Sequence, residues 1–202
     1  MNFEFKISDN DGEILVKMAR SSVTEYLQNH TKITDHEFNS KFNVNAGVFV
    51  TINKEGSLRG CIGYPLPIKK LSDGIIDSAI SAATKDPRFP EININELNDI
   101  VFEVTVLTQP TEINVKQHED YLSMIKIGRD GLIIENKYGS GLLLPQVPKE
   151  FGWNVEQFLS YTSEKAGLDK NAWKDHNTKV SRFEGIIFKE ECPNGKVVRE
   201  IL

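Results

Sequence analysis

Residues 100–107, Ile-Val-Phe-Glu-Val-Thr-Val-Leu, are the segment that most restricts how this chain can fold. Alternate side chains of a β-strand point to opposite faces, and here both alternating sets are mainly apolar. Such a pattern is compatible with a strand inside a sheet that is covered on both faces. Glu103 is the exception, and a carboxylate buried there needs a partner because burying a lone charge is costly.

The other strand-like segments occur as neighbours joined by short turns, which is typical of antiparallel hairpins. The last turn, Pro193-Asn194-Gly195, is a strong hairpin signal, so we expect residues 192–202 to form a peripheral C-terminal hairpin. The expected pairs are 48–52 with 58–63, 124–127 with 132–135, and 180–190 with 196–201, with a further strand at 141–144.

Three segments have the apolar spacing of amphipathic helices. They are residues 13–29, a segment that starts at Ser72 and stops before Pro87, and a segment that opens at Asn154 with a capping-box pattern. Helices mixed with hairpins, without regular βαβ alternation, indicate the α+β class. We therefore expect antiparallel sheets with flanking helices.

The chain has 202 residues, and no low-complexity segment or flexible linker divides it, so we expect a single domain over residues 1–202. A hydrophobic content of 39% and a charged content of 26% are ordinary for a globular protein. The formal charge of −5 is unfavourable for neutralising a phosphate backbone. No zinc finger or RNA-binding motif appears, so nucleic acid is not an expected partner.

The sequence favours a cytoplasmic protein. Its first residues lack the apolar core of a signal peptide, and no apolar run is long enough to span a membrane. Cys61 and Cys192 do not form a Cys-x-x-Cys motif, and a lone disulfide is not expected without a secretion signal. We expect both to be reduced thiols.

The segment Leu58-Arg59-Gly60-Cys61-Ile62-Gly63 is the first candidate for a functional site. Two glycines bracket a thiol, which permits close approach of other groups. Arg59 and Cys61 share a face if the segment is a strand, and a guanidinium there would lower the pKa of the thiol. Cys61 is then a nucleophile or a polar contact. The alternative is a buried, structural cysteine beside a bulge.

Two other loops are stiffened by proline. The first presents Asp86 and Arg88, which form either a binding loop or a structural Asp–Arg pair. In the second, Gln146 is the one polar side chain of an apolar run and would either contact a polar ligand or satisfy backbone groups. Glu103 is a further candidate contact.

No metal or cofactor is expected. The histidines (His30, His36, His118 and His176) and the two cysteines lack zinc-ligand spacing, and glycine-rich nucleotide loops are absent. All four histidines lie in polar surroundings outside the motif segments. A Cys–His pair therefore cannot be argued from spacing.

The motifs taken together resemble the AMMECR family. Their order carries the resemblance, which covers most of the chain from the first helix to Phe188. The matching pieces are residues 58–63, 86–89 (Asp-Pro-Arg-Phe), 103–107, 128–132, 142–147 (Leu-Leu-Leu-Pro-Gln-Val), 165–168 and Trp173. Many relatives carry a cysteine where this chain has Ser163, so a mechanism that needs that second thiol is not expected here.

The resemblance implies a compact α+β fold with a large and a small subdomain around a cleft, and it places Arg59 and Cys61 near their junction. It also implies an intracellular protein without an established reaction, linked by gene association to Memo-type and radical-SAM proteins. The residues themselves leave two functions open. One is an enzyme for a small polar or anionic metabolite, with Cys61 and Asp86 as catalytic candidates and Arg59, Arg88, Gln146 and Glu103 as ligand contacts. The other is a non-catalytic binding or adaptor module.

Overall fold

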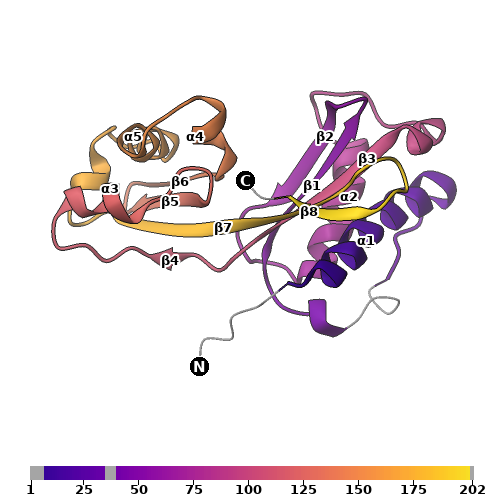
Figure 1. Ribbon diagram of the computed structural model, residues 1–202, viewed down its shortest axis with the longest axis horizontal. Coiled ribbons are helices and arrows are strands. Elements are labelled where there is room, and N and C mark those ends of the chain that lie inside the picture. Colours follow the sequence, from indigo (N-terminus) through magenta and orange to yellow (C-terminus); the bar gives the residue numbers. More distant parts are fainter. Residues whose placement is uncertain (1–6, 35–39, 201–202) are drawn as a thin grey trace. The chain divides into compact units, whose positions relative to one another are not determined.

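The computed structural model describes residues 7–34 and 40–200 and has the expected α+β architecture (Figure 1). The α-helices are α1 (Asp9–Asn29), α2 (Leu71–Thr84), α3 (Tyr121–Met124), α4 (Gln146–Glu150) and α5 (Val155–Lys165), and the short 3-10 helices are η2 (Ser40–Phe42), η3 (Ile94–Asn98), η4 (His118–Asp120) and η5 (Ala172–Lys174). The strands are β1 (Gly47–Lys54), β2 (Ser57–Tyr64), β3 (Ile100–Leu107), β4 (Thr111–Glu112), β5 (Asp130–Asn136), β6 (Gly139–Leu143), β7 (Lys179–Glu190) and β8 (Val197–Glu200).

The strands pair as an antiparallel sheet in the order β2-β1-β3-β7-β5-β6, with β4 and β8 also pairing with β7. The chain divides into two compact units. Among the described residues, unit 1 comprises residues 7–34, 40–107 and 186–200, and unit 2 comprises residues 108–185. The long strand β7 therefore contributes residues to both units.

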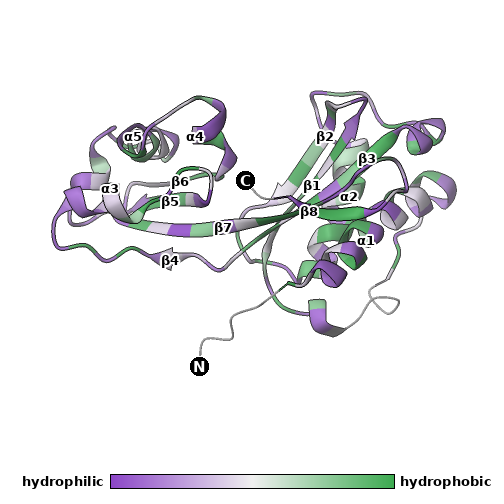
Figure 2. Ribbon diagram, in the orientation of Figure 1, coloured by the Kyte–Doolittle hydropathy of each residue, from purple (hydrophilic) through white to green (hydrophobic). Residues whose placement is uncertain are grey.

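Unit 1 has its core between one face of its sheet and the helices α1 and α2. Helix α2 packs on β1 and β2, and α1 packs on β3 and α2. Figure 2 shows hydrophobic residues along these strands and helices. Val48, Val50 and Ile52 of β1 are fully buried because alternate residues of the strand face the helices. The expected pairing of β1 with β2 is confirmed.

A buried ion pair connects α1 to two strands of unit 1. Arg20 of α1 donates to both carboxylate oxygens of Glu190, at 2.6 and 2.5 Å, and to the carbonyl oxygens of Leu97 and Ile100. Glu190 also accepts the backbone N–H of Phe102 at 2.9 Å. Because every charged group in this cluster is paired, the cost of burying it is offset.

Unit 2 has a separate core beneath α5. Phe158 and Leu159 of α5 pack with Leu132 and Ile134 of β5 and with Trp173. The capping box predicted at Asn154 is present: its side chain accepts the backbone N–H of Gln157 at 2.9 Å. The helix therefore begins where the sequence pattern placed it.

Two local predictions are wrong. Residues 124–127 are not a strand, because α3 ends at Met124 and a turn follows. Gly128 adopts φ +83°, and Asp130 accepts the backbone N–H of Lys126 at 2.8 Å. The partner of β5 is β6, through a register that includes Ile134 opposite Gly141. The first helix also begins earlier than residue 13, because Ser8 and Asp11 form its capping box.

Candidate functional site

Three of the polar side chains of unit 1 lie in one row across the sheet. Thr51 of β1 pairs directly with Cys61 of β2 on one side and with Glu103 of β3 on the other. Directly opposite residues of antiparallel strands point to the same face. Neighbouring residues such as Ile62 and Ile52 pack in the core with the helices, so the row occupies the opposite face of the sheet.

Gly60, the residue before Cys61, lies directly against helix α2. A Cβ atom at this position would lie 2.2 Å from the carbonyl oxygen of Ala82 in α2, so a larger residue cannot fit without moving backbone. The pairing of β1 with β2 also shifts between Ile52 and Asn53, next to Gly60. This glycine therefore lets α2 approach the sheet closely.

Asp86 and Arg88 hold the outer edge of β2. This strand comes first in the strand order, so its outward backbone groups have no neighbouring strand. Asp86 accepts the backbone N–H of Cys61 at 2.9 Å, and Arg88 donates to the carbonyl oxygen of Cys61 at 3.3 Å. The two side chains thus satisfy the edge where Cys61 lies.

The ion pair between Asp86 and Arg88 is asymmetric in its burial. The Asp86 side chain is 2% exposed, whereas that of Arg88 is 53% exposed. Hydrogen bonds from Arg88 hold the pKa of Asp86 well below its usual range, and the N–H of Cys61 adds to this effect. Arg88 donates from Nε and Nη2 to the carboxylate of Asp86 and from Nη2 to the carbonyl oxygen of Cys61. Among the described residues nothing accepts from its Nη1, which leaves donors for a ligand.

Arg59 has a different partner from the one expected. Its guanidinium donates to both carboxylate oxygens of Glu96, at 3.2 and 3.1 Å, and to the carbonyl oxygens of Pro90 and Glu91. These contacts tie β2 to η3 and the loop before it, and the hydrogen bonds from Arg59 to Glu96 are the largest cause that lowers the pKa of Glu96 to about 2. Arg59 holds the loop that follows Arg88.

The pKa of the Cys61 thiol is raised, chiefly because burial disfavours the thiolate. The Thr51 hydroxyl, 3.4 Å from Sγ, and the charge of Arg88 oppose this rise, and Glu103 and Asp86 reinforce it. The expectation that Arg59 lowers the pKa of the thiol is therefore wrong: the nearby guanidinium is that of Arg88, and burial outweighs it. Cys61 is free and half-buried.

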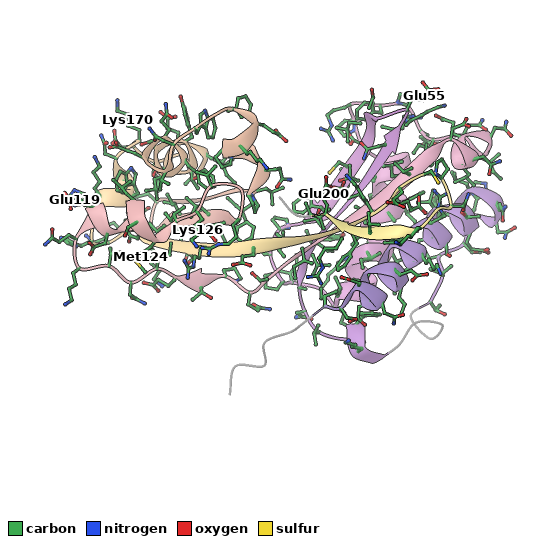
Figure 3. The ribbon with its side chains drawn as sticks, in the orientation of Figure 1. Glu55, Glu119, Met124, Lys126, Lys170 and Glu200 are labelled. Atoms are coloured by element: carbon green, nitrogen blue, oxygen red, sulfur yellow. The ribbon has the colours of Figure 1, made fainter. Side chains whose placement is uncertain are left out.

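Glu103 is half-buried at the other end of the row. Burial raises the pKa of its carboxyl group, Glu200 raises it further, and Lys189 lowers it. Lys189 of β7 is paired with Glu200 of β8 at 2.7 Å, and Figure 3 labels Glu200. Sequence reasoning missed Thr51, Lys189 and Glu200. Strand periodicity assigns each to a face, but only the register places them beside Cys61 and Glu103.

The remaining candidates do not belong to this row. Gln146 is the first residue of α4 in unit 2, and its Oε1 is buried with no hydrogen-bond partner among the described residues. His118 and His176 also lie in unit 2, and His30 ends α1. His36 is outside the described residues.

Within residues 7–34 and 40–200, no group of three or more histidine, cysteine or acidic side chains is arranged to hold a metal ion. The described helices include none that is long and apolar enough to cross a membrane.

The fold and the row define an α+β protein with a half-buried thiol and a half-buried carboxyl group on one sheet face, on either side of Thr51. The chain belongs to the AMMECR1 family, which matches residues 16–188. A protein of Thermococcus onnurineus is 49% identical over 98% of this chain and 99% of its own, and one of Methanothermobacter thermautotrophicus is 47% identical over 92% and 97%. The crystal structure of uncharacterized protein PH0010 from Pyrococcus horikoshii is similar, with a TM-score of 0.85, 44% identity, and coverage of 97% of this chain and 99% of that one. The names of these three relatives specify no activity.

Proposed function

We propose that the Cys61–Thr51–Glu103 row is the catalytic face of an enzyme that acts on a small polar or anionic metabolite. The observation that carries the proposal is the row itself, in which two weak acids with raised pKa values share one sheet face. Titratable groups perturbed by burial and by specific neighbours are concentrated at functional sites.

Cys61 is the proposed nucleophile: burial raises the pKa of its thiol, but the Thr51 hydroxyl and the charge of Arg88 oppose that rise and favour the thiolate. A thiol adds across a polarised carbonyl group: sulfur bonds to carbon, the π electrons move to oxygen, and the thiol proton ends on that oxygen. Thr51 contacts the sulfur, and Glu103 lies one strand further along the row. A raised pKa brings the titration of Glu103 closer to neutral pH, which suits this carboxyl group to exchange a proton with a substrate that spans the row.

Arg88 is the proposed contact for a negative group of the substrate, through its Nη1 donors. Asp86 stays ionised because its pKa is low, so we assign it a positioning role toward Arg88 and the backbone of Cys61. Arg59 positions the following loop through Glu96. In unit 2, Gln146 stays a separate candidate ligand contact, because its buried amide oxygen lacks a donor among the described residues.

The test is to purify the protein from its native host and identify bound small molecules by mass spectrometry. Cys61→Ser and Glu103→Gln are compared with Cys192→Ser, which removes the exposed thiol outside the row. We expect a metabolite that is retained by the wild type and by Cys192→Ser, and that is lost or left unconverted by the two row variants. Identical small molecules in equal amounts on all four proteins would refute the proposal.

A non-catalytic adaptor is the second candidate, and an aromatic stack in unit 2 favours it. Trp153 lies between Phe151 and Tyr161, with ring centroids 5.1 and 4.1 Å apart, and Phe151 is 66% exposed. Exposed aromatic side chains are common in protein interfaces. Proteins of the Memo-type or radical-SAM pathway are the first partners to test. A stoichiometric partner that is lost on Phe151→Ala would support this function, and turnover by the isolated chain would count against it.

A further inference from the structure

Unit 2 contains a small polar cavity that the motifs did not indicate. Two segments about sixty residues apart in sequence enclose it: β4 with the following loop, and η5 with the residues after it. Its volume is about 150 Å³. A space of this size admits a ligand of a few non-hydrogen atoms.

The wall of this cavity is aromatic and fixed. Trp173 is 2% exposed, and the rings of His118 and Tyr121 meet it edge-on, with centroids 6.1 and 6.3 Å from its own. Edge-to-face packing of this kind holds rings in defined orientations. The lining side chains of Tyr121 and His118 are therefore placed before any ligand arrives.

Several lining groups are already satisfied. Asp175 accepts from the backbone and the side-chain amide of Asn177, at 2.9 and 3.1 Å. The Lys174 ammonium lies 3.4 Å from Glu156 and 4.7 Å from the ring centroid of Trp173. These groups shape the cavity, but their charges are engaged elsewhere.

The remaining lining side chains that could bind a ligand include one cation, one anion and a neutral hydroxyl donor. The side chains of Lys116, Glu112 and Tyr121 line the cavity and have no hydrogen-bond or ion-pair partner within the described residues, and Lys116 and Glu112 are exposed. Tyr121 is more than nine-tenths buried, and burial together with the charge of Glu112 raises the pKa of its hydroxyl, so it remains a donor. The Tyr121 hydroxyl has no acceptor within the described residues and is available to donate to a ligand in the cavity.

We propose that this cavity binds a small zwitterion of the α-amino acid class. The ligand carboxylate accepts from Lys116 and from the Tyr121 hydroxyl, and its ammonium group lies against Glu112. A simple anion would place a second negative charge beside Glu112 and leave that carboxylate without a partner. A simple cation would place a second positive charge beside Lys116 and leave that ammonium group without a partner. A ligand that carries both charges pairs both side chains. The size of the cavity restricts the ligand to the smallest members of the class.

The experiment is a titration of the full chain with glycine, followed by the indole N–H signals of both tryptophans in ¹H–¹⁵N spectra. We expect a saturable shift for Trp173, which lines the cavity, and none for Trp153, which does not. Acetate, which has only the carboxylate of glycine, and methylammonium, which has only its ammonium group, are titrated separately at matched ionic strength. Each should bind at least about tenfold more weakly than glycine, a difference in binding free energy of about 1.4 kcal/mol.

Lys116→Ala and Glu112→Gln should each weaken glycine binding about tenfold, while Lys170→Ala, an exposed lysine of unit 2 outside the cavity (Figure 3), should leave it unchanged. All three positions are exposed, so the variants should fold. No saturable shift of Trp173 with glycine would overturn the proposal. Acetate or methylammonium binding as tightly as glycine would also overturn it, as would glycine affinity that survives both cavity substitutions.

Discussion

The carboxylate of Asp86 accepts the backbone N–H of Cys61 at 2.9 Å, although the two residues are 25 positions apart. On the free edge of β2 this bond pairs a backbone N–H that a neighbouring strand would otherwise pair. It also fixes the backbone that carries the thiol. The Asp-Pro-Arg-Phe motif and the Cys61 motif are therefore parts of one structural arrangement in unit 1.

Asp86→Ala should destabilise the protein by about 3 kcal/mol, because it leaves the Cys61 N–H unpaired and removes the partner of Arg88. Asp86→Asn should cost less, since an amide oxygen can still accept from Cys61. Urea denaturation measures both, with Asp73→Ala, an exposed aspartate of α2, as the control. Equal, small effects of all three substitutions would show that the Asp86 bond contributes little.

Acid should weaken unit 1 through Glu96. The pKa of this residue is lowered to about 2 by Arg59, from an ordinary value of 4.5. A lowered folded-state pKa gives stability that is complete above the unfolded value and is lost as the pH falls toward the folded one. The free energy of unfolding should therefore fall between about pH 4.5 and 2 more steeply in the wild type than in Glu96→Gln. Parallel curves for the two proteins would contradict the role of Glu96.

The two thiols should differ in reactivity. At pH 7 Cys61 should react with iodoacetamide at least about tenfold more slowly than exposed Cys192, because burial raises its pKa and restricts access. Arg88→Ala should slow Cys61 further, since the charge of Arg88 lowers the pKa of that thiol. Mass spectrometry of the two cysteine peptides over time gives both rates, and Cys192 is the internal reference. Faster labelling of Cys61 would mean that its thiolate is favoured instead.

Gly60→Ala should destabilise the protein by about 1–3 kcal/mol, because the added methyl group would press on the carbonyl oxygen of Ala82. Ser57→Ala, at an exposed position of the same strand, is the matched control and should change stability by less than about 0.5 kcal/mol. Thermal and urea unfolding measure both. A neutral Gly60→Ala would show that α2 can shift away from β2 at little cost.

The sequence by itself determined the α+β class, the pairing of β1 with β2, the pairing of β7 with β8, and the start of α5. These features depend on local periodicity, turn residues and capping side chains, which act over a few positions. Residues 124–127 were one of two local failures. Their apolar pattern is short enough to suit a strand or a helix end, and the turn around Gly128 decided between them.

Only the tertiary structure decided which side chains meet. The row of Cys61, Thr51 and Glu103 depends on strand register, and a shift of one residue would move each side chain to the other face. The partner of Arg59 is Glu96 because a long side chain reaches whichever carboxylate the packing of a distant loop brings near. Contacts of this kind are set by long-range packing, which no local pattern in the chain encodes.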